Sequence, residues 1–165
     1  YENGELIKQL DFLMDSELEK LLQTFVKNSA WPYKFGKHIE QRIGLVNCST
    51  IGRKCPQNQR DDYYQWDHNK ERKTLCKIVE DARPELEATI GGQISIDIYP
   101  KGKNKAQVLG DIIGPITFFG DKCRPGGNDF PIVERLGQLN EQTNLSCTIH
   151  AVKDYKDTWE ILKRK

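Results

Sequence analysis

Residues 116–129 read ITFFGDKCRPGGND, an apolar run that ends in Gly-Asp and is followed by a Pro-Gly-Gly turn. A short continuous run of β-branched and aromatic residues is typical of a strand that is buried on both faces, as in a parallel α/β sheet. In such sheets, ligands bind at the carboxyl ends of the strands. The run therefore predicts a buried parallel strand that ends beside Asp121, at an edge where ligands bind.

Two carboxylates, Asp121 and Asp129, stand on either side of Lys122 and the glycine-rich turn. A hard cation such as Mg²⁺ takes one or two carboxylates and keeps several waters. Asp121 is the candidate ligand, Asp129 either binds the ion or holds its waters, and Lys122 screens the charge. The spacing alone leaves an alternative open, in which Asp129 caps the helix that follows.

The remaining chain predicts two units with a boundary near Pro100–Lys105. After this boundary the order is helix, strand, helix, strand, helix, which is a doubly wound α/β pattern. Two strands are few for such a sheet, so further strands are expected before Tyr1. The first unit is predicted as an antiparallel α+β fold. Its elements are a helix over 11–30 capped by Asp15 or Ser16, a strand over about 38–49, a polar helix, a helix that ends near Ala82, and a strand apolar at Ile94, Ile96 and Ile98.

Arginines recur in and after the first predicted strand, at Arg42, Arg53 and Arg60. An arginine close to a helix start suits a phosphate dianion, and the small residues around Arg53 favour an anion site. Single arginines are nevertheless common on solvated surfaces. Ser95 and Asp97 share one face of their strand and suit sugar hydroxyls, although the same alternation describes an ordinary solvent face.

Composition excludes several classes of function. The chain has 165 residues, a net charge of +1 and five cysteines. The small net charge gives no general attraction to nucleic acid or to a membrane, and no apolar run has the length of a membrane span. An odd number of cysteines without a CxxC pair indicates reduced thiols and a cytoplasmic protein. His38, His68 and His150 are too widely spaced to suggest a zinc site.

Three motifs together resemble the eukaryotic-type phosphomannomutases of the haloacid-dehalogenase superfamily. The motifs are IEQRIGLVNCSTIGRKC at 39–55, IGGQISIDIYPKG at 90–102 and FFGDKCRPGGND at 118–129. The leading ENG and the closing IHAVKDYKDT also fit. Together, these stretches follow the family's order along nearly the whole chain.

The resemblance implies a fold, an activity and a set of site residues. The family has a Rossmann-like core and an α/β cap, and it interconverts mannose 6-phosphate and mannose 1-phosphate through a hexose bisphosphate with Mg²⁺. Residues 1–4 then belong to the core, 5–100 to a cap with an antiparallel sheet, and 101–165 to the core again. The family also implies GDP-mannose biosynthesis and a homodimer through the caps. The residues that match its sites are Arg42, Arg53 and Arg60 for the distal phosphate, Ser95 and Asp97 for the sugar, Lys105 near the transferring phosphoryl group, and Asp121 for Mg²⁺ with Asp129 behind it.

Three departures from the family pattern qualify this expectation. The family's Asp-x-Asp-x-Thr motif, with its nucleophile and acid/base, does not occur in the chain and is expected upstream of it. The segment 102–105 reads GKNK where the family has Gly-Trp-Asp-Lys, and the entry into the cap is short. Two alternatives therefore stay open: a sugar-phosphate phosphatase on the same fold, and a non-catalytic binding or structural subunit derived from the family.

Overall fold

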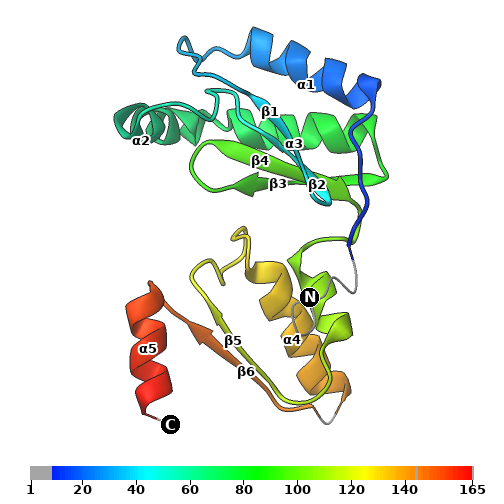
Figure 1. Cartoon of the computed structure of the whole chain (residues 1–165), viewed down its shortest axis with the longest axis vertical. Coiled ribbons are helices and arrows are strands. Elements are labelled where there is room, and N and C mark those ends of the chain that lie inside the picture. The colour runs from blue at the N-terminus through cyan, green and yellow to red at the C-terminus, as the bar shows by residue number, and fades with distance from the viewer. Residues whose placement is uncertain (1–8, 144, 165) are drawn as a thin grey trace. The chain divides into compact units, whose positions relative to one another are not determined.

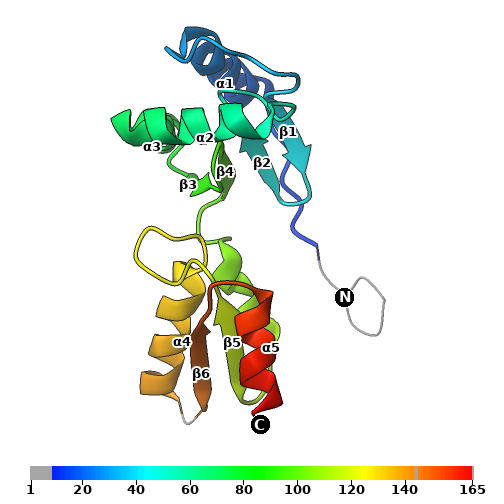
Figure 2. The ribbon, with the colours of Figure 1, turned by 90° about the vertical axis from the view of Figure 1, so that its left-hand side faces the viewer.

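The computed structural model describes residues 9–143 and 145–164, and these residues divide into two compact units between Gly102 and Lys103 (Figures 1 and 2). This division lies inside the boundary region predicted from the sequence. The predicted core segment 1–4 lies outside the described residues.

The first unit is a four-stranded antiparallel sheet with the order β1-β2-β4-β3, with helices packed on one face. Antiparallel sheets commonly keep one packed and one polar face. The bounds of its elements are α1 Ser16–Asn28, β1 Ile39–Arg42, β2 Leu45–Cys48, α2 Gln57–Trp66, the 3₁₀ helix η1 Asp67–Asn69, α3 Glu71–Ala82, β3 Leu86–Gly91 and β4 Ser95–Pro100.

The core of the first unit lies between the sheet and the helices α1 and α3. Each helix contributes buried apolar residues one turn apart, which is the spacing of a helix that presents one face. The fully buried members are Leu18 and Leu22 of α1, Leu75 and Val79 of α3, and Val46, Ile96 and Ile98 of the strands. Since this face of the sheet takes up the apolar side chains, the alternate residues of the same strands point to the opposite face.

Helix α1 begins where the sequence predicted, with Asp15 as its N-cap. The Asp15 carboxylate accepts the backbone N–H of Leu18 at 2.8 Å, and it also pairs with Arg83 at 2.7 Å. The hydrogen bonds from Arg83 and from Leu18 lower the pKa of Asp15 to about 2. The cap therefore keeps its negative charge at the positive end of the helix.

The predicted single strand over 38–49 is wrong, because β1 and β2 form a hairpin. Arg42 pairs with Leu45, so only Ile43 and Gly44 make the turn, and Gly44 has a φ of 71°. Strand β3 was also missed in the sequence. Its residues Leu86–Gly91 follow Pro84 and pair with β4 along their whole length.

The second unit is a parallel pair of strands, β5 Ile116–Gly120 and β6 Cys147–Ala151, which confirms the predicted parallel strand. Helices α4 Phe130–Gln142 and α5 Tyr155–Lys163 lie on opposite sides of this pair (Figures 1 and 2). The predicted helix over 103–113 forms as the 3₁₀ helix η2 Lys105–Asp111 and not as an α-helix. A small core joins η2, β5 and α4 through Leu109, Ile116, Ile132 and Leu136, and β6 packs against it.

Candidate functional site

Asp121 follows the last residue of β5 and lies at the carboxyl end of the parallel pair. The strand end forms one wall of a pocket that the turn after β5 and the residues after β6 complete, over 121–127 and 151–153. The N–H of Val152 donates to the carbonyl of Gly120 at 3.0 Å, which keeps the two strand ends together. The structure therefore places Asp121 where the rule for parallel sheets puts a ligand.

Asp129 lies at the start of α4 but does not cap it with its side chain. Its Oδ1 accepts Lys105 Nζ at 2.7 Å, and its Oδ2 accepts the backbone N–H of Lys122 at 3.2 Å. Burial raises the pKa of Asp129, but these hydrogen bonds outweigh burial and hold the pKa below its ordinary value. The structure thus brings Lys105, Asp129 and the turn after Asp121 together, and it gives Asp129 contacts that the capping alternative does not require.

The oxygen donors at this strand end fit Mg²⁺ better than zinc. Asp121 is exposed, and its carboxylate lies within hydrogen-bonding reach of Asp129. Among the described residues, no cluster of at least three histidine, cysteine or acidic side chains is placed to hold a metal. Zinc sites need such a set, whereas Mg²⁺ takes one or two carboxylates and completes its shell with water. Asp121 would bind the ion directly, and Asp129 would orient its waters.

Cys123 adjoins the same carboxylates and stays protonated. Burial and the negative charges of Asp129 and Asp121 raise the pKa of its thiol. The Sγ atom donates to the carbonyl of Gly120 at 3.2 Å. A neutral thiol leaves the carboxylates as the anionic groups of this turn.

The other set of predicted residues lies in the first unit, with Arg42, Ser95 and Asp97 on strands of the sheet, Arg53 in the loop after β2 and Arg60 on α2. On β1, Arg42 Nη2 donates to Glu40 Oε2 at 2.7 Å, and Arg53 Nε lies 3.6 Å from the same oxygen. The structure therefore joins Arg42 to Arg53 through a carboxylate that the sequence analysis did not single out. The alternation of side chains along β1 is the signal that places Glu40 and Arg42 on one face.

The third arginine, Arg60, supports the loop that carries Arg53. Arg60 lies in the first turn of α2, where its Nη2 donates to the carbonyl of Arg53 at 3.0 Å and its Nε donates to the carbonyl of Cys55 at 3.3 Å. The Arg53 N–H is bound to the carbonyl of Lys37 at 2.8 Å. A guanidinium has five N–H donors, so Arg60 can hold this loop and still donate to an anion.

Ser95 and Asp97 lie on the same polar face, but they are not an ordinary solvent face. Ser95 is buried, and its hydroxyl donates to the carbonyl of Gly91 at 3.0 Å. Asp97 Oδ1 accepts the side-chain amide of Asn47 at 2.7 Å. Asn47 was not a predicted site residue, because its role depends on the pairing of β2 with β4.

Glu40 offers a direct test of the arginine pair. The hydrogen bond from Arg42 is the main cause that lowers the pKa of Glu40, and Arg53 and Lys37 add to it. In Arg42→Gln, we expect this pKa to rise toward its ordinary value of 4.5. The stabilisation that ionised Glu40 contributes is present above its unfolded-state pKa and is lost as the pH falls through the lowered folded-state pKa. The unfolding free energy of the variant should therefore fall less steeply over this acidic range. A ¹³C NMR titration of the Glu40 carboxyl measures the shift.

The matched control for this titration is Arg135→Gln, which removes an exposed arginine of α4 that contacts Gln138. It should leave the pKa of Glu40 where it is. An unchanged value in Arg42→Gln would contradict the pairing.

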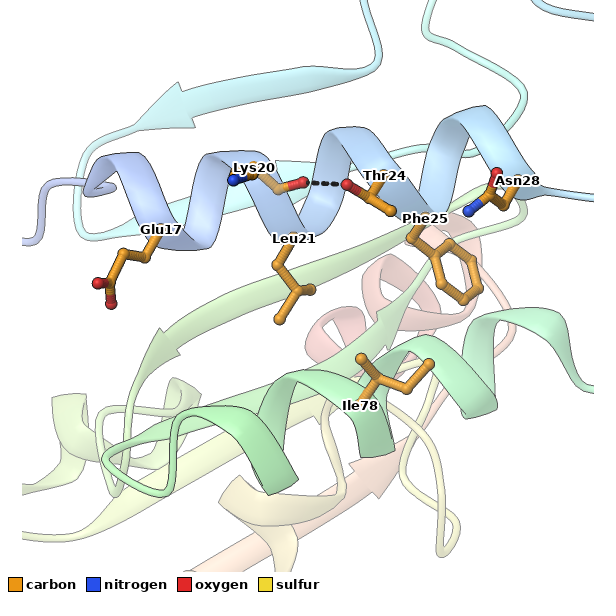
Figure 3. A pocket seen from close by; sticks show the side chains of 7 residues that line it. All are labelled: Glu17, Lys20, Leu21, Thr24, Phe25, Asn28 and Ile78. Atoms are coloured by element: carbon orange, nitrogen blue, oxygen red, sulfur yellow. Dashed lines mark hydrogen bonds between the residues drawn. The ribbon is translucent and has the colours of Figure 1, made fainter.

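A largely apolar groove lies between α1 and α3 on the outer side of the first unit (Figure 3). Leu21 and Phe25 of α1 face Ile78 of α3 across it, and Glu17 and Asn28 stand near its ends. Ile78 is 38% exposed, so the groove keeps apolar surface open to solvent. The groove lies on the helical side of the sheet and not on the polar side.

The structure is a mixed α/β fold with an antiparallel cap-like unit, consistent with the haloacid-dehalogenase type. A family model described as eukaryotic phosphomannomutase matches residues 4–164. The chain belongs to this family.

Plant proteins named phosphomannomutase are among the similar curated proteins. Those of Dendrobium officinale and Oryza sativa subsp. japonica are 38% identical over 145 residues, which is 81% of this chain and 58% of each relative. That of Arabidopsis thaliana is 40% identical over 131 residues, which is 74% of this chain and 53% of the relative. The chain thus spans a little over half the length of the curated relatives it matches.

Proposed function

We propose that the protein transfers a phosphoryl group between positions of a hexose phosphate, as a Mg²⁺-dependent phosphomannomutase that interconverts mannose 6-phosphate and mannose 1-phosphate through a hexose bisphosphate. One observation carries the proposal: Arg42 and Arg53 both pair with Glu40 on β1, Arg60 of α2 holds the loop that carries Arg53, and Glu40 shares its sheet face with Asp97. This face offers cations for a phosphate and a carboxylate for sugar hydroxyls in one unit.

In this proposal, the first unit binds the substrate and the second unit binds the metal ion. In the first unit, the arginines hold the phosphate that does not react, and Asp97, with the buried Ser95 beside it on β4, orients the sugar. In the second unit, Asp121 and Asp129 would hold Mg²⁺, which neutralises charge on the phosphoryl oxygens when it is bound. Lys105 keeps Asp129 ionised and adds a positive charge beside the reacting group. The resemblance assigns the nucleophile to an Asp-x-Asp-x-Thr motif that residues 1–165 do not contain.

The test is a product analysis with the full-length protein, mannose 1-phosphate and Mg²⁺, with and without a hexose bisphosphate. Mannose 6-phosphate that forms faster with the bisphosphate is the expected result. Release of mannose and inorganic phosphate would contradict the mutase and show a phosphatase activity. Binding of the sugar phosphate without any product would contradict catalysis and favour a non-catalytic binding subunit.

We propose in addition that two copies pair through the first unit, and that the protein is cytoplasmic and serves GDP-mannose synthesis. The family resemblance supports these proposals, and the apolar groove between α1 and α3 supports pairing through this unit. Among the described residues, no helix has both the length and the apolar character to cross a bilayer.

A further inference from the structure

We propose that Asn47 is a positioning residue that sets the carboxylate of Asp97 for the sugar, and that it thereby controls sugar recognition separately from phosphate binding. The inference deepens the proposed function and rests on it. It concerns a buried amide to which neither the family resemblance nor the predicted site assigned a role.

Asn47 and Asp97 form a direct side-chain pair across two strands. The residues are register partners on β2 and β4, and Asn47 Nδ2 donates to Asp97 Oδ1 at 2.7 Å. Asn47 is only 2% exposed, whereas Asp97 is half-buried and open to the polar side of the sheet. The amide therefore acts on a ligand through Asp97 and does not reach the ligand itself.

The other carboxylate oxygen of Asp97, Oδ2, lies against the backbone of Gly91 on the neighbouring strand β3. A Cβ atom on Gly91 would lie 2.7 Å from Asp97 Oδ2, so the carboxylate occupies the space that any other residue at Gly91 would fill. The hydroxyl of neighbouring Ser95 donates to the Gly91 carbonyl. Asp97 is thus confined by Asn47 on β2 and by Gly91 on β3, which leaves little freedom for its side chain.

The hydrogen bond to Asp97 fixes the orientation of the Asn47 amide and leaves its oxygen without a partner among the described residues. With Nδ2 toward Asp97, the buried Oδ1 of Asn47 makes no hydrogen bond with any residue that the structure describes. The reverse orientation would place two oxygens at hydrogen-bond distance. A buried acceptor without a partner destabilises a fold, and an apolar residue of similar size would avoid this cost. The asparagine is therefore better explained by the position of Asp97 than by packing.

The arginine pair is supported by different contacts. Glu40 of β1 is the register partner of Asn47 and pairs with both Arg42 and Arg53. The loop around Arg53 is held by its own N–H, which donates to the Lys37 carbonyl, and by Arg60, which donates to the Arg53 carbonyl. These contacts do not pass through the Asn47 amide. Loss of that amide should free Asp97 and leave the phosphate contacts in place.

The experiment is isothermal titration of the chain with mannose 1-phosphate and, separately, with inorganic phosphate. In Asn47→Leu, the Kd for mannose 1-phosphate should rise by at least ~10-fold, because the sugar hydroxyl then meets a carboxylate that is no longer held in position. The Kd for inorganic phosphate should change by less than about two-fold, because the arginines remain. Gln23→Leu, which removes an exposed side-chain amide of α1 outside the groove, is the matched control and should change neither constant.

A second variant keeps the test decisive where Asn47→Leu does not fold. Gly91→Ala pushes Asp97 from the opposite strand, so it should reproduce the split between the two ligands. Equal losses for both ligands, or no loss for either, would overturn the positioning role. Failure of the unmodified protein to bind either ligand would instead overturn the proposed function, and the inference with it.

Discussion

Replacement of Asp121 by alanine in the full-length protein is expected to lower Mg²⁺-dependent turnover by at least about 1,000-fold. Asp121 is the exposed carboxylate at the end of β5, while its neighbour Asp129 is already paired with Lys105 at 2.7 Å. A bound cation stabilises the charge of a phosphoryl-transfer transition state by several kcal/mol, and each 1.36 kcal/mol corresponds to a factor of about ten in rate. Steady-state assays across a range of Mg²⁺ concentrations measure the loss.

Two further variants show whether Asp121 acts through the metal. Asp129→Asn should weaken the apparent Mg²⁺ affinity by about 10–100-fold, the usual effect of losing a group that orients a ligand. Asp81→Ala removes an exposed carboxylate of α3 that pairs only with Lys77 at 3.1 Å in the described residues, and it should change neither rate nor affinity. Asp121 would lose its assignment as the ligand if its variant kept the normal turnover and Mg²⁺ dependence.

Local sequence signals were sufficient for most of the second unit. The β-branched and aromatic run before Asp121 forms the predicted strand, and the glycine-rich turn that follows separates it from α4. The strand is less buried than predicted, because Thr117 is exposed and Phe118 and Phe119 are half-buried. The N-cap at Asp15 was equally predictable, because capping depends on contacts within one helical turn. These features form from residues that are close in the sequence.

Features that depend on the pairing of one strand with the next were missed. Leu86, Glu87 and Ala88 are residues that also favour helices, so only their pairing with β4 makes β3 a strand. The hairpin of β1 and β2 was missed because Ile-Gly is a weak turn signal beside the Asn-Gly and Asp-Gly pairs of common hairpins. In both places the structure depends on how two neighbouring segments pair, which the residue preferences of a single segment do not show.

The candidate site shows the same division. Asp121 followed from its place after a strand, whereas Arg42, Arg53, Arg60 and the pair on β4 gained their roles from the family resemblance. Glu40 and Asn47 were absent from both sources. Glu40 joins Arg42 of its own strand to Arg53 on a loop, and Asn47 contacts Asp97 on another strand, so the second partner of Glu40 and the partner of Asn47 come close only in the fold. A residue that works by supporting another residue leaves little signal in a single sequence.

The largest loss of stability in the first unit is expected from Asp67→Ala. Asp67 and Arg72 are both buried, at 8% and 4% exposure, and they form an ion pair at 2.6 Å between η1 and α3. Asp67 also accepts the backbone N–H of Arg72 at 3.0 Å. Removal of one partner leaves the other charge buried without compensation, which costs about 3–5 kcal/mol of unfolding free energy. Urea unfolding followed by circular dichroism measures this loss.

A double substitution separates the cost of an uncompensated charge from the value of the pair itself. In Asp67→Ala with Arg72→Met, no charge remains buried at this point, so much of the lost stability should return. The guanidinium of Arg72 also donates to the carbonyl of Gly92 at 2.9 Å and lies 5.9 Å from the ring centre of Tyr63, so recovery should be incomplete. Asp81→Ala, which breaks an exposed pair, should cost no more than about 1 kcal/mol. If Asp67→Ala cost as little as this control, the pair would contribute no more to the fold than a surface contact, and the sharp junction between η1 and α3 would have to be held by the aromatic residues around it.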